Sequence, residues 1–211
     1  MRSTRVLHLP RLAGAAALAA LVAGALSTGA AAVDKTVPDC PPQTLVQPFL
    51  PWHDHGSYFL APGGAFETTP AGWTLSGGAA VVPGNEPYHV NAAGDANSLS
   101  LPTGSSATSP QICVTIHSPN IRLFSTNGGS SRSFLTVSVN YTDRHGAAKT
   151  ASIGMLRAGS SWSVSSQLQF ISRIAPIVGG HGQTWVSFTF MPTSAGAWQI
   201  DDFYVDPLKS Q

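Results

Sequence analysis

The chain has 211 residues, of which 43% are hydrophobic and only 10% are charged, and its formal net charge at pH 7 is +1. Its basic residues beyond residue 100 stand singly rather than in a stripe, at Arg122, Arg132, Arg144, Lys149, Arg157, Arg173 and Lys209. Because a nucleic-acid-binding surface needs a clustered basic patch, this pattern argues against nucleic acid as a partner.

Residues 1–32 have the order of a secretory signal peptide. Three arginines precede the uncharged run LAGAAALAALVAGAL at residues 12–26, and small residues follow up to Ala32. The run is shorter than the about 20 apolar residues that a membrane-spanning helix needs. We therefore expect cleavage near Ala32 and secretion of a mature chain that does not span the membrane. That chain carries eight basic and ten acidic side chains.

Residues 33–62 are predicted to form an extended tail that lies over the domain. The segment is proline-rich and has no sustained periodicity, as in VPDCPPQTLVQPFLP. It contains Cys40, whereas Cys113 lies in the domain that follows, and an exported pair of cysteines most simply forms one disulfide. Two free thiols are the alternative. A bridge would attach the tail to the domain and stabilise the fold by about 4 kcal/mol.

Residues 63–211 are predicted to form one all-β domain. Apolar and polar residues alternate with the period of a half-buried strand in SFLTVSVNYTD, WSVSSQLQF and WVSFTF. Further strand candidates bounded by turn residues are GWTLSG, AAVV, SLSL, QICVTI, IRLFS and WQIDDFYV, and YTDRHGAAKT is typical of a hairpin turn. The helix-like stretch QFISRIAPIV is interrupted by Pro176. This pattern predicts a single antiparallel β-sandwich, a jelly roll.

Two motifs resemble known jelly rolls. GGAFETTPAGWTLSGGAAVV, residues 63–82, resembles the first strand of galactose-binding-like domains and carbohydrate-binding modules, and WQIDDFYVDP, residues 198–207, resembles their last strand. Within them, Trp73 and Trp198 are expected to pack in the core or at its rim. The order of the chain, with a Pro-Trp tail before the domain, also resembles small secreted actinobacterial proteins without an assigned role. The resemblance implies the jelly-roll fold and a structural calcium at one rim.

Glu67 and Asp201 are the candidate calcium ligands. Strand alternation places Asp201 on the inward face with Phe203 and Val205, and Asp202 on the opposite face. A buried carboxylate has to be paired, protonated or bound to metal. If the first and last strands are neighbours, Glu67 and Asp201 meet at one rim, and oxygen ligands suit calcium. The alternative is that both carboxylates bind loop amides or arginine side chains without metal.

The stretch PWHDHG has the appearance of a metal site. His53 and His55 would share one face of a strand and could bind zinc or copper. Two ligands do not complete a site, however, and Asp54 would point to the opposite side. We therefore expect no metal centre at this stretch.

The sequence predicts no catalytic activity. No serine lies in a G-x-S-x-G motif, and VGGHGQT lacks the lysine and the strand-to-helix setting of a phosphate loop. A hydrolase whose residues converge from distant loops stays open as an alternative.

Binding is the predicted function. Trp185 belongs to the outward set of its strand, and Thr136, Ser138 and Asn140 belong to the outward set of another. We predict that these four residues bind a carbohydrate or another cell-envelope ligand. Two alternatives remain: Trp185 is covered by the tail or by a loop, or the chain is an extracellular structural or protein-interaction domain that has no sugar site.

Overall fold

The computed structural model describes residues 40–115, 117, 120–178 and 182–206, which fall in one structural unit. The predicted signal peptide, residues 1–32, and the start of the predicted tail, residues 33–39, lie outside the described residues. Among the residues described, no helix is long and apolar enough to cross a membrane.

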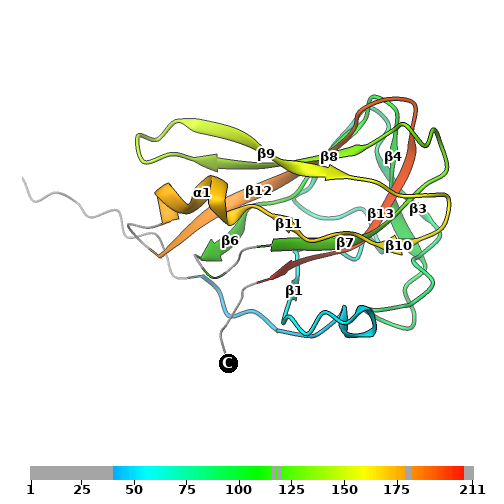
Figure 1. Cartoon of the computed structure of the whole chain (residues 1–211), viewed down its shortest axis with the longest axis horizontal. Helices are drawn as coiled ribbons and strands as arrows, with labels where there is room; N and C mark the ends of the chain where they lie inside the picture. Colours follow the sequence, from blue (N-terminus) through cyan, green and yellow to red (C-terminus); the bar gives the residue numbers. More distant parts are fainter. Residues whose placement is uncertain (1–39, 116, 118–119, 179–181, 207–211) are drawn as a thin grey trace, which may run out of the picture. The chain divides into compact units, whose positions relative to one another are not determined.

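Two antiparallel sheets form the described domain (Figure 1). Sheet I has the strand order β10-β7-β13-β4-β3, with β1 paired to β13 and β11 paired to β7. Its strands are β1 Phe59–Leu60, β3 Ala80–Pro83, β4 Asn97–Pro102, β7 Asn120–Asn127, β10 Ser163–Val164, β11 Leu168–Gln169 and β13 Ala197–Asp206.

Sheet II has the order β2-β5-β12-β8-β9, with β6 paired to β12. Its strands are β2 Thr74–Ser76, β5 Ser106–Thr108, β6 Ile112–Thr115, β8 Leu135–Thr142, β9 Ala148–Leu156 and β12 Gln183–Pro192. The two helices in the described part are the 3-10 helix η1 Leu50–Trp52 and α1 Ile171–Val178, which runs across Pro176. The predicted antiparallel β-sandwich is confirmed.

The main core lies between the two sheets and follows from strand alternation. The inward residues of β8 and β12 are fully buried, among them Val137, Val139 and Phe188. Trp73 and Trp198 pack in the same core, as expected. Each indole N–H finds an acceptor, because Trp73 Nε1 donates to the Pro62 carbonyl at 2.8 Å and Trp198 Nε1 donates to Ser133 Oγ at 3.0 Å. The indole N–H groups of both tryptophans are therefore satisfied.

The prediction of one continuous strand over residues 162–170 is wrong. β10 and β11 both pair with β7 but are separated by residues 165–167. At the break, the Ser165 carbonyl accepts hydrogen bonds from Arg122 Nε at 3.1 Å and Nη2 at 2.9 Å. Ser165 Oγ also accepts the backbone N–H of Leu123 at 3.1 Å. The arginine side chain and the serine hydroxyl thus replace part of the strand ladder.

The predicted hairpin turn after β8 is confirmed. Asp143 closes it, because its Oδ1 accepts the backbone N–H groups of His145 and Ala147, each at 2.9 Å. Its backbone N–H also donates to the Ala147 carbonyl at 2.9 Å. Short polar residues are favoured at such turns for this reason.

The described part of the predicted tail, residues 40–62, joins the sandwich. Val46 forms a bridge with Tyr58, and β1 pairs with β13 through Phe59 opposite Val205 and Leu60 opposite Tyr204. Figure 1 shows the segment, in blue and cyan, running beside β7 and β13 on the side of sheet I that faces away from sheet II. Residues 46–60 therefore extend sheet I and cover its outer face.

Candidate functional site

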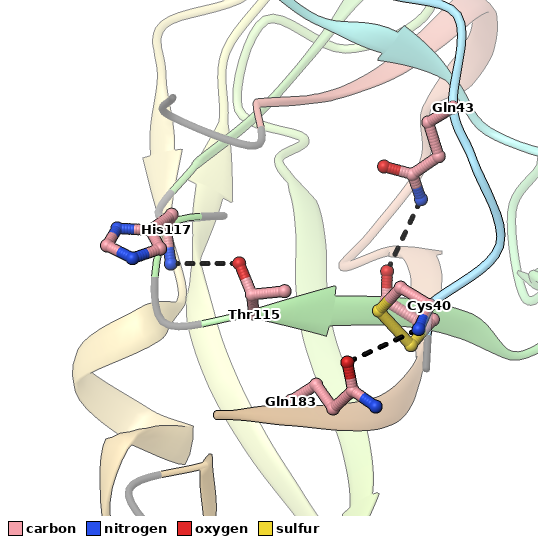
Figure 2. The surroundings of a disulfide bond; sticks show 6 residues. Cys40, Gln43, Thr115, His117 and Gln183 are labelled. Atoms are coloured by element: carbon pink, nitrogen blue, oxygen red, sulfur yellow. Dashed lines mark hydrogen bonds between the residues drawn. A yellow bond between two sulfur atoms is a disulfide. The ribbon is translucent and has the colours of Figure 1, made fainter. Parts of the chain in front are cut away.

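The tail has a covalent anchor at its beginning (Figure 2). Cys40 and Cys113 form a disulfide with their Cα atoms 5.3 Å apart, which confirms the predicted pairing. Cys113 lies on β6 directly opposite Trp185 of β12. Two hydrogen bonds reinforce the bridge: Cys40 N donates to Gln183 Oε1 at 3.2 Å, and Gln43 Nε2 donates to the Cys113 carbonyl at 3.5 Å. Cys40 is thereby held close to Trp185.

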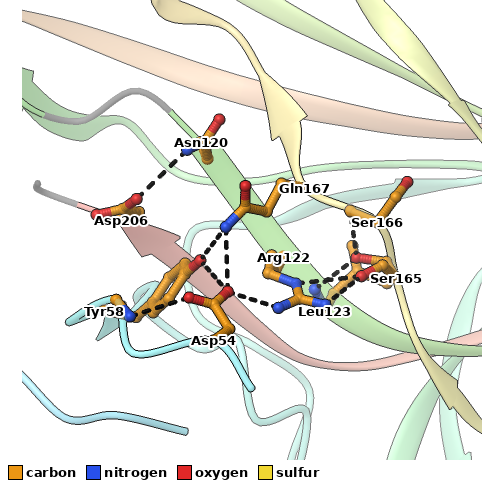
Figure 3. Close-up of polar contacts among 10 residues, drawn as sticks. Asp54, Tyr58, Asn120, Arg122, Leu123, Ser165, Ser166, Gln167 and Asp206 are labelled. Atoms are coloured by element: carbon orange, nitrogen blue, oxygen red, sulfur yellow. Dashed lines mark hydrogen bonds and ion pairs between the residues drawn. The ribbon is translucent and has the colours of Figure 1, made fainter. Parts of the chain in front are cut away.

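A polar cluster around Asp54 forms the second anchor (Figure 3). Asp54 Oδ2 pairs with Arg122 Nη1 at 2.5 Å and accepts hydrogen bonds from the Tyr58 hydroxyl at 2.7 Å and Gln167 Nε2 at 3.1 Å. The Arg122 and Asp54 side chains are 10% and 13% exposed. Burial alone would raise the pKa of Asp54, but hydrogen bonds from Tyr58, the Gly56 amide, Arg122 and Gln167 outweigh it and lower that pKa.

A second, aromatic core surrounds this cluster on the outer face of sheet I. Phe49 and Tyr58 of the tail pack on Phe124 of β7 and Tyr204 of β13. The Phe49 ring centroid lies 4.9 Å from that of Tyr58 and 5.6 Å from that of Tyr204. The Arg122 guanidinium lies 4.7 Å from the same centroid, in cation–π range. The tail is thus held by apolar contact as well as by charge.

Within PWHDHG, the Asp54 side chain rather than the histidine side chains holds the tail to sheet I, through Arg122. His53 ends η1 with a left-handed φ of 60°, and the side chains of His53 and His55 are both exposed. Within the described residues, no group of three or more His, Cys, Asp and Glu side chains is arranged to hold a metal ion. We call the Asp54–Arg122 pair the polar latch. Sequence reasoning missed it because Arg122 lies 68 residues further along the chain than Asp54.

A cavity of about 360 Å³ opens where the tail passes from the disulfide toward sheet I. We call it the disulfide-side cavity. Trp185, Cys113 and Gln111 line one side, and tail residues 41–44 with Leu60 line another. Trp185 is half-buried there. The tail therefore borders Trp185 but leaves room against it.

A second cavity, of about 330 Å³, lies further along the tail. We call it the Tyr204-side cavity, and tail residues 46–48 line it together with Asn91 and Tyr204. Thr44 and Leu60 line both cavities. The hollow along the tail is therefore a pair of adjoining spaces, which could not be located from the sequence because their walls come from distant segments.

The four predicted ligand-binding residues share one outer face of sheet II: Trp185, Thr136, Ser138 and Asn140. β8 and β12 are paired over this stretch, with Asn140 opposite Ser187. The Asn140 amide is engaged within the sheet, because Nδ2 donates to Thr189 Oγ1 at 2.9 Å and Oδ1 accepts Thr150 Oγ1 at 2.8 Å. Of the four residues, Trp185 lines a cavity.

The predicted inward orientation of Asp201 is wrong. Asp201 pairs with Phe124, whose side chain lies in the aromatic core on the outer face of sheet I. A β-bulge follows Asp201, and Asp202 adopts a left-handed φ of 48°. The extra residue reverses the alternation, so that Ile200 and Phe203 both enter the main core. Asp201 and Asp202 are nevertheless both buried.

The two predicted calcium ligands bind backbone amides of different loops. The Glu67 carboxylate accepts the N–H groups of residues 96–97 at 2.9 and 3.1 Å. The Asp201 carboxylate accepts those of Glu86 at 3.1 Å and Asp202 at 2.9 Å. Each of the two carboxylates therefore has two backbone-amide partners.

Asp202 has a carboxylate oxygen to spare. Its Oδ2 accepts the Asn91 N–H at 3.1 Å, whereas its buried Oδ1 has no hydrogen-bond partner within the described residues. Burial, Asp202 and Glu86 raise the pKa of Asp201 to about 8. Burial and the nearby carboxylates of Glu86 and Asp95 raise the pKa of Asp202 to about 7. We call the group formed by Glu86, Asp95, Asp201 and Asp202 the acidic rim, and it carries a strong negative charge when ionised.

No protein-family model matches the chain, and a search of curated proteins found no match. Solved structures do share its fold. The chain is similar to the CBM22-1-GH10 modules of Clostridium thermocellum endo-1,4-beta-D-xylanase 10B, with 13% identity, a TM-score of 0.50 and coverage of 69% of this chain and 28% of that one.

The chain has a β-sandwich like that of carbohydrate-binding modules. The CBM22-1 xylan-binding domain of Paenibacillus barcinonensis Xyn10C gives 19% identity and a TM-score of 0.49, with 70% of this chain and 94% of that domain covered. The module TmCBM61, in complex with beta-1,4-galactotriose, gives 19% identity, a TM-score of 0.39 and coverage of 69% and 95%. At 13% identity, the similarity to the xylanase modules concerns the fold.

Proposed function

We propose that this chain is a secreted, noncatalytic carbohydrate-binding domain whose ligand binds in the disulfide-side cavity against Trp185. The observation that carries the proposal is a half-buried indole in the wall of a cavity of about 360 Å³. Cavities of this size accommodate small ligands. The solved structures of similar fold include xylan- and galactotriose-binding modules.

The lining of the cavity suits a sugar ring. The flat indole of Trp185 offers an apolar surface to the C–H groups of a pyranose, while Gln43, Thr44 and Gln111 offer amide and hydroxyl groups to its oxygens. Thr136, Ser138 and Asn140 offer further hydroxyl and amide groups on the outer face of sheet II but line neither cavity. We assign them a weaker, extending role, because the Asn140 amide is already engaged by neighbouring strands.

An array of glycans and cell-wall polysaccharides, probed with labelled mature chain, tests the proposal. For each carbohydrate that binds, Trp185→Ala should weaken binding at least about tenfold, which corresponds to about 1.4 kcal/mol. The matched control is Trp162→Ala, because Trp162 is also half-buried but lines neither cavity. Equal binding by both variants and the unmodified chain would place the ligand elsewhere.

The same array separates the other candidate functions. No binding to any glycan, together with retained binding to a protein of the cell surface, would favour a structural or interaction domain. Turnover of any arrayed substrate above a heat-inactivated control would favour the hydrolase. Mass spectrometry of the exported chain tests secretion, with an N-terminus expected near residue 33.

We also propose that the acidic rim around Asp202 binds a structural calcium. Asp202 would be the ligand in place of Asp201, which the sequence suggested. The supporting observation is the buried, unpartnered Oδ1 of Asp202. Glu67 lies close enough to raise the pKa of Asp202. The carboxylates of Glu67 and Asp201 already accept backbone N–H groups. Backbone or side-chain amide oxygens would therefore have to complete the calcium shell around Asp202.

Thermal unfolding with calcium and with chelator tests this second proposal. Calcium at about a hundredfold excess over its Kd should raise stability by about 3 kcal/mol. Asp202→Asn should abolish the gain, and Asp201→Asn should reduce it less, because the Asp201 oxygens already accept two amides. Elemental analysis has to verify that the starting protein is metal-free. An unchanged melting temperature in calcium would refute the site.

A further inference from the structure

We propose that the ligand is a neutral oligosaccharide of two or more rings that runs from the disulfide-side cavity past Thr44 and Leu60 into the Tyr204-side cavity. This inference rests on the proposed function and extends it. The proposed function requires one sugar ring against Trp185, whereas the further inference concerns the length, the charge and the path of the ligand.

The first argument is the continuity of the two spaces. The cavities have similar volumes, about 360 and 330 Å³, and each lies at the lower end of the range for ligand pockets. Thr44 and Leu60 line both, so the two spaces are neighbours along the tail, and a ligand that crosses these two residues would occupy both. Two small adjoining spaces accommodate a chain of rings better than one bulky ligand.

The second argument is the uncharged lining. Neither cavity is lined by an arginine, lysine, aspartate or glutamate side chain. An anionic sugar would therefore find no cationic side chain in the lining of either cavity to pair with its charge. The ligand should therefore be neutral.

The third argument is a set of polar groups in the Tyr204-side cavity. Tyr204 is 2% exposed, and it lines this cavity. The side-chain amides of Gln47 and Asn91 each donate one hydrogen bond. Gln47 Nε2 donates to the His55 carbonyl and Asn91 Nδ2 donates to Asp95 Oδ2, each at 2.9 Å. Their amide oxygens accept no bond from described residues. A phenol and two side-chain amides in the lining are suited to hydrogen bonds with sugar hydroxyls.

The fourth argument is rigidity. The tail wall is held by the Cys40–Cys113 disulfide at one end and by the Asp54–Arg122 pair at the other. Because both anchors already exist in the free protein, the groove is formed before the ligand arrives. A preformed site avoids the entropic cost of ordering the wall on binding.

Calorimetry on the disulfide-bonded chain tests the inference with defined probes. These are xylo-, cello- and chito-oligosaccharides of one to six units, and oligogalacturonates as their anionic counterparts. For at least one neutral series, affinity should rise at least about tenfold between one unit and the length that spans both cavities, and then level off. Oligogalacturonates should bind more weakly than neutral chains of the same length.

Single substitutions assign the added affinity to the second cavity. Tyr204→Phe keeps the ring and removes the hydroxyl, so it should reduce the affinity of long chains several-fold and leave single units unchanged. Thr44→Arg should place a long side chain at the shared wall and remove the gain with length. The matched control is Tyr88→Phe, since Tyr88 is 47% exposed and lines neither cavity. Unchanged melting temperatures verify the fold of each variant.

The outcomes separate the two proposals. Binding through Trp185 without any gain with length would overturn this inference and leave the proposed function intact. A length gain that survives both Tyr204→Phe and Thr44→Arg would also overturn it, because the added rings would then lie elsewhere. Preference for oligogalacturonates would refute the neutral class. Binding of extended peptides and of no saccharide would overturn both proposals.

Discussion

The two outer faces of the sandwich differ in what they present and in how they are covered. Sheet I presents Phe124, Tyr204 and Arg122, and the tail covers all three with aromatic rings and a carboxylate. Sheet II presents hydroxyl and amide side chains that bond to one another across neighbouring strands, such as Thr108 with Thr189 at 2.8 Å. Covering the aromatic face stabilises the fold because it removes apolar surface from water, whereas the hydroxyl face can remain hydrated.

The comparison explains why the cavities occur where they do. The tail is held on sheet I by close packing and on sheet II by one disulfide, and between these attachments it crosses the edge of the sandwich. Both cavities lie along that crossing. The structural role of the tail and its role in the proposed site therefore depend on different residues, which mutation can separate.

Removing the covalent attachment should have the largest effect on stability. The disulfide closes a sequence separation of 73 residues, and the chain-entropy model assigns such a loop about 4 kcal/mol. The double variant Cys40→Ser with Cys113→Ser should lose about this much in urea unfolding. The unmodified chain unfolded in reductant provides the control. A loss below about 1 kcal/mol would mean that the sheet I contacts alone hold the tail.

Removing the aromatic attachment should cost slightly less. Phe49 is fully buried between tail and sheet I, and truncation of such a phenylalanine costs about 3 kcal/mol where the site can partly collapse. We expect this loss for Phe49→Ala in urea unfolding. Leu50→Ala is the matched control, because Leu50 is 44% exposed and should cost less than about 0.5 kcal/mol. Equal losses would show that the second core does not hold the tail.

Weakening the polar latch should have a smaller effect that depends on pH. Asp54→Asn removes the charge that faces the buried Arg122 and should cost about 2 kcal/mol at pH 7. The folded pKa of Asp54 is lowered, so its contribution is present above the unfolded pKa of about 4 and is lost as pH falls through the folded pKa. The difference between the two proteins should therefore shrink in acid. A difference that stays constant down to pH 2 would contradict the latch.

The acidic rim of sheet I should make the free energy of unfolding depend on pH with the opposite sign to that of the polar latch. The pKa values of Asp201 and Asp202 are raised to about 8 and about 7, so the folded state keeps protons that the unfolded chain has released. In metal-free buffer, the free energy of unfolding should therefore fall as pH rises from about 4 to 8, because unfolding then releases the protons that the two carboxyls hold.

Asp202→Asn should flatten this slope, because one of the two raised carboxyls is removed. The control is Asp143→Asn in the hairpin of sheet II, where hydrogen bonds from backbone amides lower the pKa of Asp143. That variant should leave the slope between pH 5 and 7 unchanged. Stability that rises with pH over this range would show that the pair is ionised in the folded state.

Much of the sandwich was predictable from local pattern. β8 and β12 alternate strictly, and both were recognised because each has a buried face and a wet face. The hairpin at Asp143 was recognisable from turn chemistry. The strand predicted over residues 162–170 failed because Arg122, on another strand, takes the Ser165 carbonyl. No local signal could have indicated that contact.

The candidate site was predictable only in part. Trp185 was selected because alternation places it outward, and the structure places it in a cavity wall. Asp54, Arg122 and Tyr204 were missed, since each acquires its role from residues at least 60 positions away or from a wall built by several segments. Asp201 was assigned to the wrong face because a bulge is specified by pairing with the neighbouring strand.

The amino-acid sequence alone determined the class of fold and the disulfide partners, because a period of two and a count of two cysteines are properties of the chain itself. Tertiary structure decided which sheet the tail covers, which way Asp201 faces and where the two cavities adjoin. Those features depend on which distant strands and loops become neighbours, and that depends on the summed packing of the whole domain rather than on any one segment.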